Sequence, residues 1–408
     1  MFESMKIVVM KFGGTSVANV EKIKNVAKIV SKNYKKNKIV VVLSAMSGVT
    51  NQLQSFIDEI DYFPSEETDL IMTSGEQVTI GLLSMILNKQ GIKSKPLLGW
   101  QIPIVTDENH EKARILNIEN KTIHHFFKSH DVIVLAGFQG ISLSGQITSL
   151  GRGGSDTTAV AIASSLSAER CDIFTDVKGV FTTDPNIVSD AKKIDKLAYE
   201  EMLEMSSTGA KVLQTRSVEL ALKNNLTLQV LSSFSNVGGT YILNENKLIE
   251  KEIVSGVSYS ENESKLTISG ILDKPGISAK IFGLMSKNNI NVDMIVQNIS
   301  QDGISANMTF TVPTKDLSFA KKILQNNGNQ INYDNLSTDS DIAKISVIGM
   351  GMMSQTGVAE KMFSTLAEKK INILAISTSE IKISVLIQKK YCELAIKSLH
   401  SVYKLSKT

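Results

Sequence analysis

The sequence predicts an α/β protein, in which a layered α/β domain with a largely parallel sheet is followed by two small α+β units. Three observations predict this fold class. Strand-like apolar runs alternate with helical patterns over residues 7–243, and two similar segments follow a short polar stretch. The length of 408 residues is also too great for one ordinary core, so two or three domains are expected.

The elements of the first domain follow from its hydrophobic periodicity. Because alternating strands and helices form parallel sheets, ligand-binding loops are expected where the strands end. The predicted strands cover residues 7–12, 39–43, 132–136, 173–175 and 227–231, and the predicted helices cover residues 20–30, 69–87 and 157–167.

The second half of the chain contains an internal repeat. The segment PGISAKIFGLMSKNNINVDMI matches TGVAEKMFSTLAEKKINILAI further along, so that Gly276 aligns with Gly357 and Asn291 with Asn372. Each copy predicts a strand, a turn, a helix and a strand, followed by a further strand and helix. Units this small are expected to pack side by side.

These patterns set the expected domain limits. The first domain covers residues 1–243, and the polar residues 244–263 are expected to form a linker. The two repeats then cover residues 264–340 and 341–408.

Composition excludes several classes of function. The net charge is only +3, and no basic stripe is interleaved with aromatic residues, so a nucleic-acid partner is not expected. No uninterrupted apolar run reaches membrane-spanning length and no signal peptide is recognisable, which predicts a cytoplasmic protein without a membrane partner. Cys171 and Cys392 are expected to be buried free thiols rather than a disulfide or a nucleophile. The five histidines show no metal-ligand spacing.

The stretch SLGRGGSDTTAVA predicts a site for a multiply charged anion. Gly151, Gly153 and Gly154 allow the backbone to approach a ligand closely, and Arg152 supplies a forked cation. A helix that opens at Ser155 would add unpaired N–H groups and a positive dipole end. On these residues alone, the alternative is a plain strand-to-helix turn with Ser155 as its N-cap.

A second glycine turn follows the first predicted strand. In KFGGTSV, Lys11 is followed by Gly13 and Gly14 just before a helical pattern. The spacing is neither that of a P-loop nor that of a dinucleotide-binding turn. Two such turns, each followed by a helix, indicate one shared anionic ligand.

These segments, taken in order, resemble the aspartate kinases of the amino acid kinase superfamily over nearly the whole chain. Besides the two turns, the resemblance rests on VVVLSAMSGVTN, TSGEQV, AGFQG, TDVKGVFTTDP and the EEMLEM…GAKVL run. The repeats resemble ACT domains, which bind free amino acids at paired interfaces; a purely structural dimerisation role is the alternative. The resemblance implies an amino acid kinase-like layered α/β domain followed by two α+β ACT domains.

The activity implied by this resemblance is ATP-dependent phosphorylation of the side-chain carboxylate of L-aspartate to 4-phospho-L-aspartate. This reaction is the first step of lysine, threonine and methionine biosynthesis in the family, with feedback by end-product amino acids through the ACT region. Two alternatives remain: a kinase for another amino acid carboxylate, and a catalytically inactive amino-acid sensor.

The expected catalytic residues are two cations and one carboxylate. Transfer of a phosphoryl group to a carboxylate brings two anions together, so the site must neutralise and align them. Lys11 is expected to hold the phosphate, and Lys211 is a second cation on the nucleotide side by the resemblance. By the resemblance, Asp156 is expected to orient the lysines. It is not expected to act as a base, because the substrate carboxylate is already ionised at neutral pH.

Recognition of aspartate requires charges of both signs. Arg152 suits the α-carboxylate by its bidentate geometry, and Glu76 suits the α-ammonium. Glu76 is expected to be buried and paired, against the alternative of a solvated carboxylate on a helix face. Neutral and backbone contacts to the substrate are assigned to Ser44, Thr50, Gly153, Gly154 and Ser155.

The nucleotide contacts are implied by the resemblance alone. Asn186 stands where similar enzymes usually carry Arg, so Lys178, Lys192 or Lys193 is expected to replace that cation. Mg²⁺ should accompany ATP, bound chiefly by phosphate oxygens and water, and no protein ligand is assigned. The expected contacts are Lys11, Phe12, Gly13, Gly14, Thr175, Asp176, Gly179, Val180, Phe181, Thr182, Asp184 and Lys211.

A regulatory amino acid, lysine or threonine or both, is expected at a seam between the repeats or between subunits. The chain is accordingly expected to form a homo-oligomer, a dimer or a tetramer, through its ACT domains. The residues assigned to the effector are Asp273, Gly276, Ile277, Gln297, Asn372 and Ile373.

Overall fold

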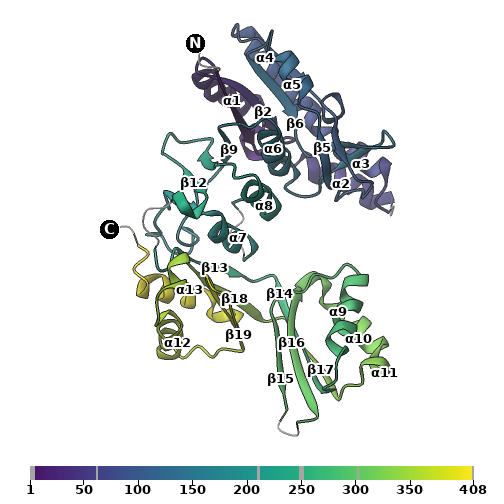
Figure 1. Ribbon diagram of the computed structural model, residues 1–408, viewed down its shortest axis with the longest axis vertical. Coiled ribbons are helices and arrows are strands. Elements are labelled where there is room, and N and C mark those ends of the chain that lie inside the picture. The colour runs from purple at the N-terminus through teal and green to yellow at the C-terminus, as the bar shows by residue number, and fades with distance from the viewer. Residues whose placement is uncertain (1–4, 61–62, 209–211, 248–251, 301–302, 407–408) are drawn as a thin grey trace. The chain divides into compact units, whose positions relative to one another are not determined.

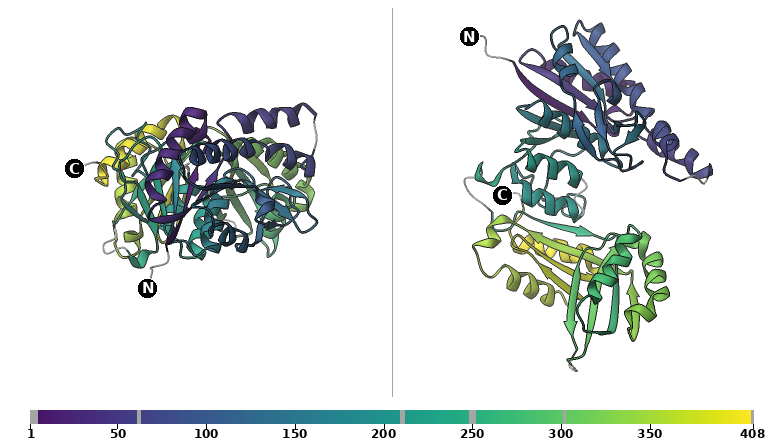
Figure 2. Two further views of the ribbon diagram at one scale, coloured as in Figure 1. Left: turned by 90° about the horizontal axis from the view of Figure 1, so that it is seen from above. Right: turned by 45° about the vertical axis from the view of Figure 1, so that its right-hand side comes forward.

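The computed structural model describes residues 5–60, 63–208, 212–247, 252–300 and 303–406. The chain divides into two compact units. The first contains residues 1–180, 193–206 and 211–249, and the second contains residues 181–192, 207–210 and 250–408. Chain colour allows each unit to be followed in Figure 1 and Figure 2.

The first unit is built on an eight-stranded sheet whose neighbours are parallel except for one pair, β11 and β12. All five predicted strands of this domain are present and lie in this sheet, which confirms the expected α/β class. The strands, in sheet order, are β10 (Lys196–Ala198), β12 (Thr240–Leu243), β11 (Leu228–Ser232), β9 (Arg170–Thr175), β1 (Lys6–Phe12), β2 (Asn37–Leu43), β6 (Val132–Ala136) and β3 (Ser94–Leu97).

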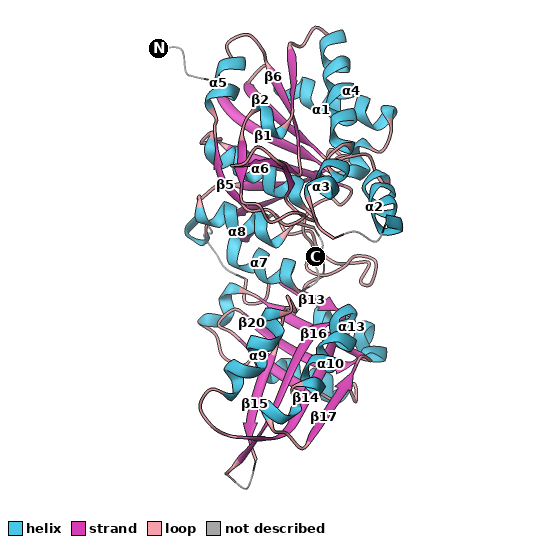
Figure 3. Cartoon of the chain, turned by 90° about the vertical axis from the view of Figure 1, so that its right-hand side faces the viewer, coloured by secondary structure: helices cyan, strands magenta, loops and turns pink. Residues whose placement is uncertain are grey.

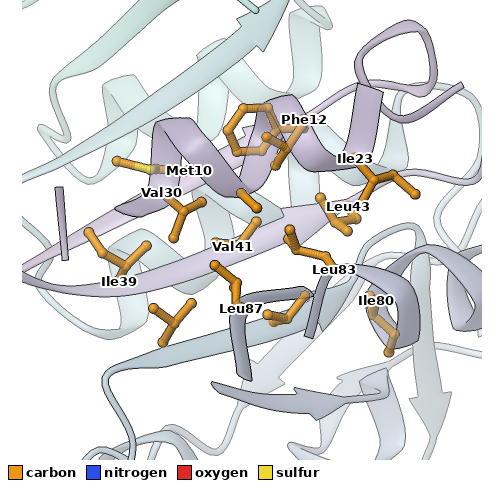
Figure 4. Close-up of a cluster of buried hydrophobic side chains, with 14 of the residues drawn as sticks. Met10, Phe12, Ile23, Val30, Ile39, Val41, Leu43, Ile80, Leu83 and Leu87 are labelled. Carbon is orange, nitrogen blue, oxygen red and sulfur yellow. The ribbon is translucent and has the colours of Figure 1, made fainter. Parts of the chain in front are cut away.

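Helices cover both faces of the central strand β1. Val8, Met10 and Phe12 belong to a core with residues of α1 (Val20–Asn33) and α4 (Gly75–Lys89). Figure 4 shows Met10 and Phe12 in this core. Because successive residues of a strand point to opposite faces, Lys11 points to the other side, where α6 (Gly154–Ser165) packs on β1. The period-2 pattern of this strand therefore places a lysine opposite the start of α6.

The predicted helix over residues 69–87 is two helices, α3 (Glu66–Met72) and α4. They separate at Thr73 and Ser74, whose hydroxyls donate to backbone carbonyl oxygens of the preceding turn. By length and composition alone, the stretch Glu66–Lys89 could cross a membrane, yet half of its most apolar window is buried inside the protein. Core helices pass the same test of composition.

A smaller sheet lies beside this framework in the first unit. Its strands are β5 (Ile115–Ile118), β4 (Ile104–Thr106), β7 (Gln139–Ser142) and β8 (Ile147–Ser149). The remaining helices of this unit are α2 (Val49–Ile60), α5 (Lys121–Phe126), α7 (Tyr199–Ser207) and α8 (Thr215–Lys223).

The second unit contains the two repeats, each with an antiparallel four-stranded sheet (Figure 3). Helices α9 (Ile277–Lys287) and α12 (Val358–Glu368) both start after a left-handed glycine, Gly276 and Gly357, each with φ of 92°. The aligned glycines thus have the same structural role. The sheet of the first repeat contains, in order, β15 (Ile295–Ile299), β16 (Ser305–Pro313), β14 (Glu263–Leu272) and β17 (Asn335–Asp339), and its further helices are α10 (Leu317–Asn326) and the short α11 (Gly328–Ile331). The sheet of the second repeat contains, in order, β13 (Gly256–Ser260), β18 (Ile342–Ile348), β20 (Lys382–Gln388) and β19 (Ala375–Thr378), and its second helix is α13 (Cys392–Val402).

Two segments lie elsewhere than the predicted domain limits suggest. The expected linker, residues 244–263, contains β13, which pairs with β18 of the second repeat. Residues 181–192 were assigned to the first domain, but Val188 and Ala191 share a core with Met362 of α12. Both placements depend on pairing between distant residues, which local sequence patterns do not encode. Cys171 and Cys392 are buried free thiols, as predicted.

Candidate active site

The centre of the candidate site is an ion pair between Lys11 and Asp156. Lys11 points from β1 toward α6, and Asp156 lies in the first turn of that helix. The Lys11 Nζ is 2.5 Å from the Asp156 Oδ1, and the two side chains are only 12% and 11% exposed. Such a shielded pair holds the lysine ammonium in one place, and Asp156 is its partner there, as expected.

In the first turn, glycine is favoured because neighbouring atoms leave little room for a side chain, not because the backbone torsion angles are unusual. Gly13 has an ordinary φ of −74°, and a Cβ there would lie 3.3 Å from the Lys11 Nζ. A Cβ on Gly14 would lie 3.0 Å from the carbonyl oxygen of Ala45. Phe12 is fully buried, and its ring stacks on Phe174 with centroids 4.5 Å apart.

The second glycine turn uses the left-handed region. Gly151 and Gly153 have φ of 77° and 74°, and Gly153 is the N-cap of α6. The helix therefore begins at Gly154, so that Ser155 is neither its N-cap nor its first residue. The amides of Gly154 and Asp156 donate to carbonyl oxygens within the turn, which leaves the exposed Arg152 and the positive helix end as its anion-attracting features.

Glu76 is the most informative acidic residue of the site. It lies in the first turn of α4, is 3% exposed, and its Oε1 accepts a hydrogen bond of 3.0 Å from the Ala45 amide. Its other oxygen, Oε2, is buried and has no hydrogen-bond partner among the described residues. Burial raises the pKa of the Glu76 carboxyl to about 7. The predicted burial is confirmed, and the open oxygen remains available to a hydrogen-bonding ligand.

The residues after the central strands meet at one edge of the sheet. Ser44 follows β2, and its amide donates to the carbonyl oxygen of Phe12, while Thr50 lies in the first turn of α2 and is half-buried. Gly137 follows β6, and a Cβ there would lie 2.8 Å from the Ser155 Oγ. The AGFQG motif contains Gly137, but the predicted site did not include it. Its constraint is the lack of space for a side chain, which only the three-dimensional structure shows.

The predicted nucleotide contacts divide between the two units. Thr175 ends β9 and donates to the Asp176 carboxylate, Gly179 has a φ of 142°, and the Val180 amide donates to Thr240. These residues belong to the first unit. Val180 itself is buried, and its carbonyl oxygen accepts a hydrogen bond from the Ile194 amide.

Phe181, Thr182 and Asp184 belong to the second unit. The Thr182 Oγ1 lies 2.9 Å from the His400 Nε2 and donates to the Leu405 carbonyl oxygen. Asp184 accepts hydrogen bonds from the Asn186 amide and the Tyr259 hydroxyl. The sequence did not predict these contacts.

Three lysines were named as substitutes for the missing arginine at Asn186. Lys193 is already engaged, because its Nζ lies 2.5 Å from the Asp195 Oδ1 and donates to the Gly239 carbonyl oxygen. Lys178 and Lys192 are exposed. Lys211, the expected second catalytic cation, lies outside the described residues. Within the described ranges, no group of three or more His, Cys, Asp or Glu side chains is arranged to hold a metal ion.

The predicted effector residues come from both repeats but from different positions in them. Asp273 and Gly276 are exposed before α9, and Ile277 is buried at its start. The Gln297 Oε1 accepts a hydrogen bond of 3.2 Å from the Ser278 hydroxyl within its own repeat. Asn372 is exposed, and Ile373 packs on the core of the second repeat. Strands β15 and β19, which belong to different repeats, lie next to each other.

Comparison with known proteins first defines the class. Residues 6–232 match the amino acid kinase family, and residues 266–327 and 345–403 match the ACT domain. The chain thus combines an amino acid kinase domain with paired ACT domains, as the motifs predicted.

Individual relatives narrow this class further. The aspartate kinase of Pseudomonas fluorescens (strain SBW25) is 50% identical over 406 residues, which cover 98% of both chains. The structure of E. coli aspartokinase III with aspartate and ADP has 26% identity and a TM-score of 0.82, covering 97% of this chain and 99% of that one. The same enzyme with lysine and aspartate has 27% identity and a TM-score of 0.75, with the same coverage. The chain belongs to the aspartate kinase family and is an enzyme.

Proposed function

We propose that the protein transfers the γ-phosphoryl group of ATP to the side-chain carboxylate of L-aspartate, which yields 4-phospho-L-aspartate and ADP. The observation that supports this assignment best is the open, buried Oε2 of Glu76. Ala45 contacts both Glu76, through its amide, and the first glycine turn, through its carbonyl oxygen. An amino acid held at Glu76 therefore lies close to the turn that follows Lys11.

Substrate recognition rests on two opposite charges. Glu76 accepts the α-ammonium of aspartate, and Arg152 binds its α-carboxylate through two parallel N–H donors. With both ends fixed, the side-chain carboxylate is directed toward the ion pair of Lys11 and Asp156. Ser44, Thr50 and Ser155, with the backbone of Gly153 and Gly154, complete the pocket with neutral contacts.

The reaction requires charge neutralisation more than proton transfer. A carboxylate oxygen of aspartate attacks the γ-phosphorus of ATP, a new O–P bond forms, and the bond between the γ-phosphorus and the β,γ-bridging oxygen breaks to release ADP. Lys11 offsets the negative charge on the transferred group, and Asp156 keeps its ammonium in place. No general base is needed, because the attacking carboxylate carries no proton at neutral pH.

The nucleotide is proposed to bind along Thr175, Asp176, Gly179 and Val180, with Phe181, Thr182, Asp184 and Lys211 as further contacts. The E. coli relative with ADP supports nucleotide use. The described residues form no dedicated metal cluster, so Mg²⁺ is proposed to arrive with ATP, bound by phosphate oxygens and water.

Regulation by a free amino acid is proposed at the ACT repeats. The E. coli relative was solved with lysine and aspartate, and the adjacent strands β15 and β19 offer a seam for such a ligand. The proposed ligand is lysine or threonine or both. The protein is proposed to be a cytoplasmic homo-oligomer formed through the ACT domains. Its reaction is proposed to be the first step in the synthesis of lysine, threonine and methionine. If the variant Gln297→Ala/Asn372→Ala keeps both end-product inhibition and oligomer size unchanged, this location is wrong.

A coupled assay of ADP formation tests the activity itself. ADP should form with L-aspartate, and far more slowly with L-glutamate or with no amino acid. Equal rates with glutamate would indicate a kinase of another specificity. No ADP with any amino acid, together with retained lysine or threonine binding, would indicate an inactive sensor.

A further inference from the structure

A buried carboxylate outside the proposed chemistry, Asp69, joins three segments of the first unit. It lies in α3 and is fully buried. Its Oδ1 accepts a hydrogen bond from the Ser149 hydroxyl at the end of β8, and the Glu111 amide donates to both of its oxygens, at 3.1 and 3.3 Å. The His110 Nδ1 lies 2.8 Å from its Oδ2. Several donors on one buried carboxylate make a rigid anchor.

The loop that Asp69 holds, residues 107–113, contacts the second glycine turn directly. The Ala113 amide donates to the Ser149 carbonyl oxygen over 2.9 Å. A Cβ on Gly151 would lie 2.9 Å from the carbonyl oxygen of Glu111, so the two backbones touch at this point. The position of the loop therefore limits the position of the turn.

Helix α8 holds the same turn from another direction. Arg216 donates to the carbonyl oxygens of Leu150, at 3.2 Å, and Ala113, at 3.0 Å. The side-chain Nε2 of Gln214, the N-cap of α8, donates to the Arg152 carbonyl oxygen at 3.0 Å, and this side chain packs where a Cβ on Gly153 would stand. The backbone on both sides of Arg152 is thus fixed by α8 and, through the loop, by Asp69.

We propose that Asp69 is a positioning residue for amino acid recognition, acting through Ser149 and the loop 107–113 on the backbone that carries Arg152. This inference rests on the proposed function, in which Arg152 binds the α-carboxylate of aspartate. The side chain of Arg152 is exposed, so its direction depends on the turn beneath it. Lys11 belongs to strand β1 in the central sheet, so loss of the anchor weakens substrate binding rather than the chemical step.

The decisive variant is Asp69→Asn, which keeps the shape of the side chain and removes its charge. Asp107→Asn is the matched control, because Asp107 accepts hydrogen bonds from the Arg114 and Asn109 amides in the same loop but is only half-buried and, within the described residues, makes no hydrogen bond to Ser149 or to the second glycine turn. The dissociation constant of L-aspartate, measured by calorimetry with a non-hydrolysable ATP analogue present, should rise about tenfold in Asp69→Asn and less than about twofold in the control. The rate constant at saturating aspartate and the KM for ATP should stay within about twofold of wild type.

Ser149→Ala removes one donor from the same carboxylate and should weaken aspartate binding in the same direction, which keeps the proposal testable if Asp69→Asn does not fold. Unchanged aspartate affinity in the folded variants would overturn it. So would equal losses in aspartate affinity, ATP affinity and turnover, because they would indicate a general structural role. Wild-type protein that binds no aspartate would overturn the proposed function and this inference together, whereas wild-type binding with unaffected variants overturns this inference alone.

Discussion

The two glycine turns of the first unit share a sequence character but differ in construction. The turn at Gly13 and Gly14 follows a strand of the central sheet, has an ordinary φ at Gly13, and touches the Lys11 ammonium. The turn at Gly151 and Gly153 has two left-handed glycines and is held from outside by α8 and the loop 107–113. We infer that the first turn carries the reaction and the second carries recognition.

This difference shows that a glycine pair in a sequence has more than one physical meaning. At Gly13 a side chain would crowd the Lys11 ammonium, whereas at Gly153 the torsion angle itself disfavours other residues. Variants of each turn can therefore separate catalysis from binding.

The largest effect is expected from removing the lysine ammonium beside the first turn. Lys11→Ala should lower the rate constant about a hundredfold or more, which corresponds to a rise in the activation free energy on the order of 3 kcal/mol. The reason is that the variant lacks the positive charge that offsets the negative charge of the transferred phosphoryl group. Aspartate affinity should change little. Steady-state kinetics check this, with Lys24→Ala, an exposed lysine of α1, as the control. Near-normal turnover with only a raised KM would refute the catalytic role.

Breaking the recognition side should instead change aspartate affinity. Arg152→Ala and Glu76→Gln each remove one charge-assisted partner, and each should weaken aspartate binding by roughly 2 to 3 kcal/mol while ATP binding stays nearly intact. Calorimetry with each ligand measures both affinities, and Glu59→Gln, an exposed carboxylate of α2, is the matched control. Lost nucleotide affinity in either variant would move that residue to the other half of the site.

The pH dependence of aspartate binding sharpens the same comparison. Burial raises the pKa of Glu76 to about 7, so the carboxyl is protonated below that pH and must lose its proton to pair with an ammonium. Aspartate affinity should therefore fall as pH drops below about 7, approaching tenfold per pH unit, and level off above it. Titrations of wild type and Glu76→Gln measure this, and equal slopes in both proteins would exclude Glu76 as the titrating group.

The smallest expected effect is a difference in the free energy of unfolding between alanine variants of the two turns. Gly153→Ala should lower the free energy of unfolding by about 1 to 3 kcal/mol, because φ is 74° there and the new Cβ meets Gln214. Gly13→Ala should cost much less stability, since φ is −74° and the nearest atom is the end of a flexible lysine, but should lower turnover by displacing it. Denaturant unfolding checks the pair, and equal losses of stability would show that the turns do not differ in this way.

Much of the fold was predictable because its signals are local. The apolar run of β1, the helix after it and the matching glycines Gly276 and Gly357 all follow from short patterns and have the predicted structure. What local patterns could not give is pairing at a distance. The contact of Thr182 with His400, the pairing of β13 with β18, and the anchor at Asp69 each join segments far apart in the chain.

The candidate site was predictable to a similar degree. Burial of Glu76 followed from its place in a mostly apolar helix, and the partnership of Lys11 with Asp156 followed from the resemblance to the amino acid kinase superfamily. The break between α3 and α4, in contrast, depends on hydroxyls of Thr73 and Ser74 that bond back to the helix backbone. The open oxygen of Glu76 is a property of three-dimensional packing and leaves no trace in the sequence.

The most direct test of the account identifies the product chemically. The protein is incubated with ATP, L-aspartate and hydroxylamine, which converts an acyl phosphate to a hydroxamate, and the product is analysed by mass spectrometry and NMR. The account predicts the side-chain hydroxamate of aspartate in a one-to-one ratio with ADP, and its loss in Lys11→Ala. ADP without a hydroxamate, or a hydroxamate on the α-carboxylate, would contradict it.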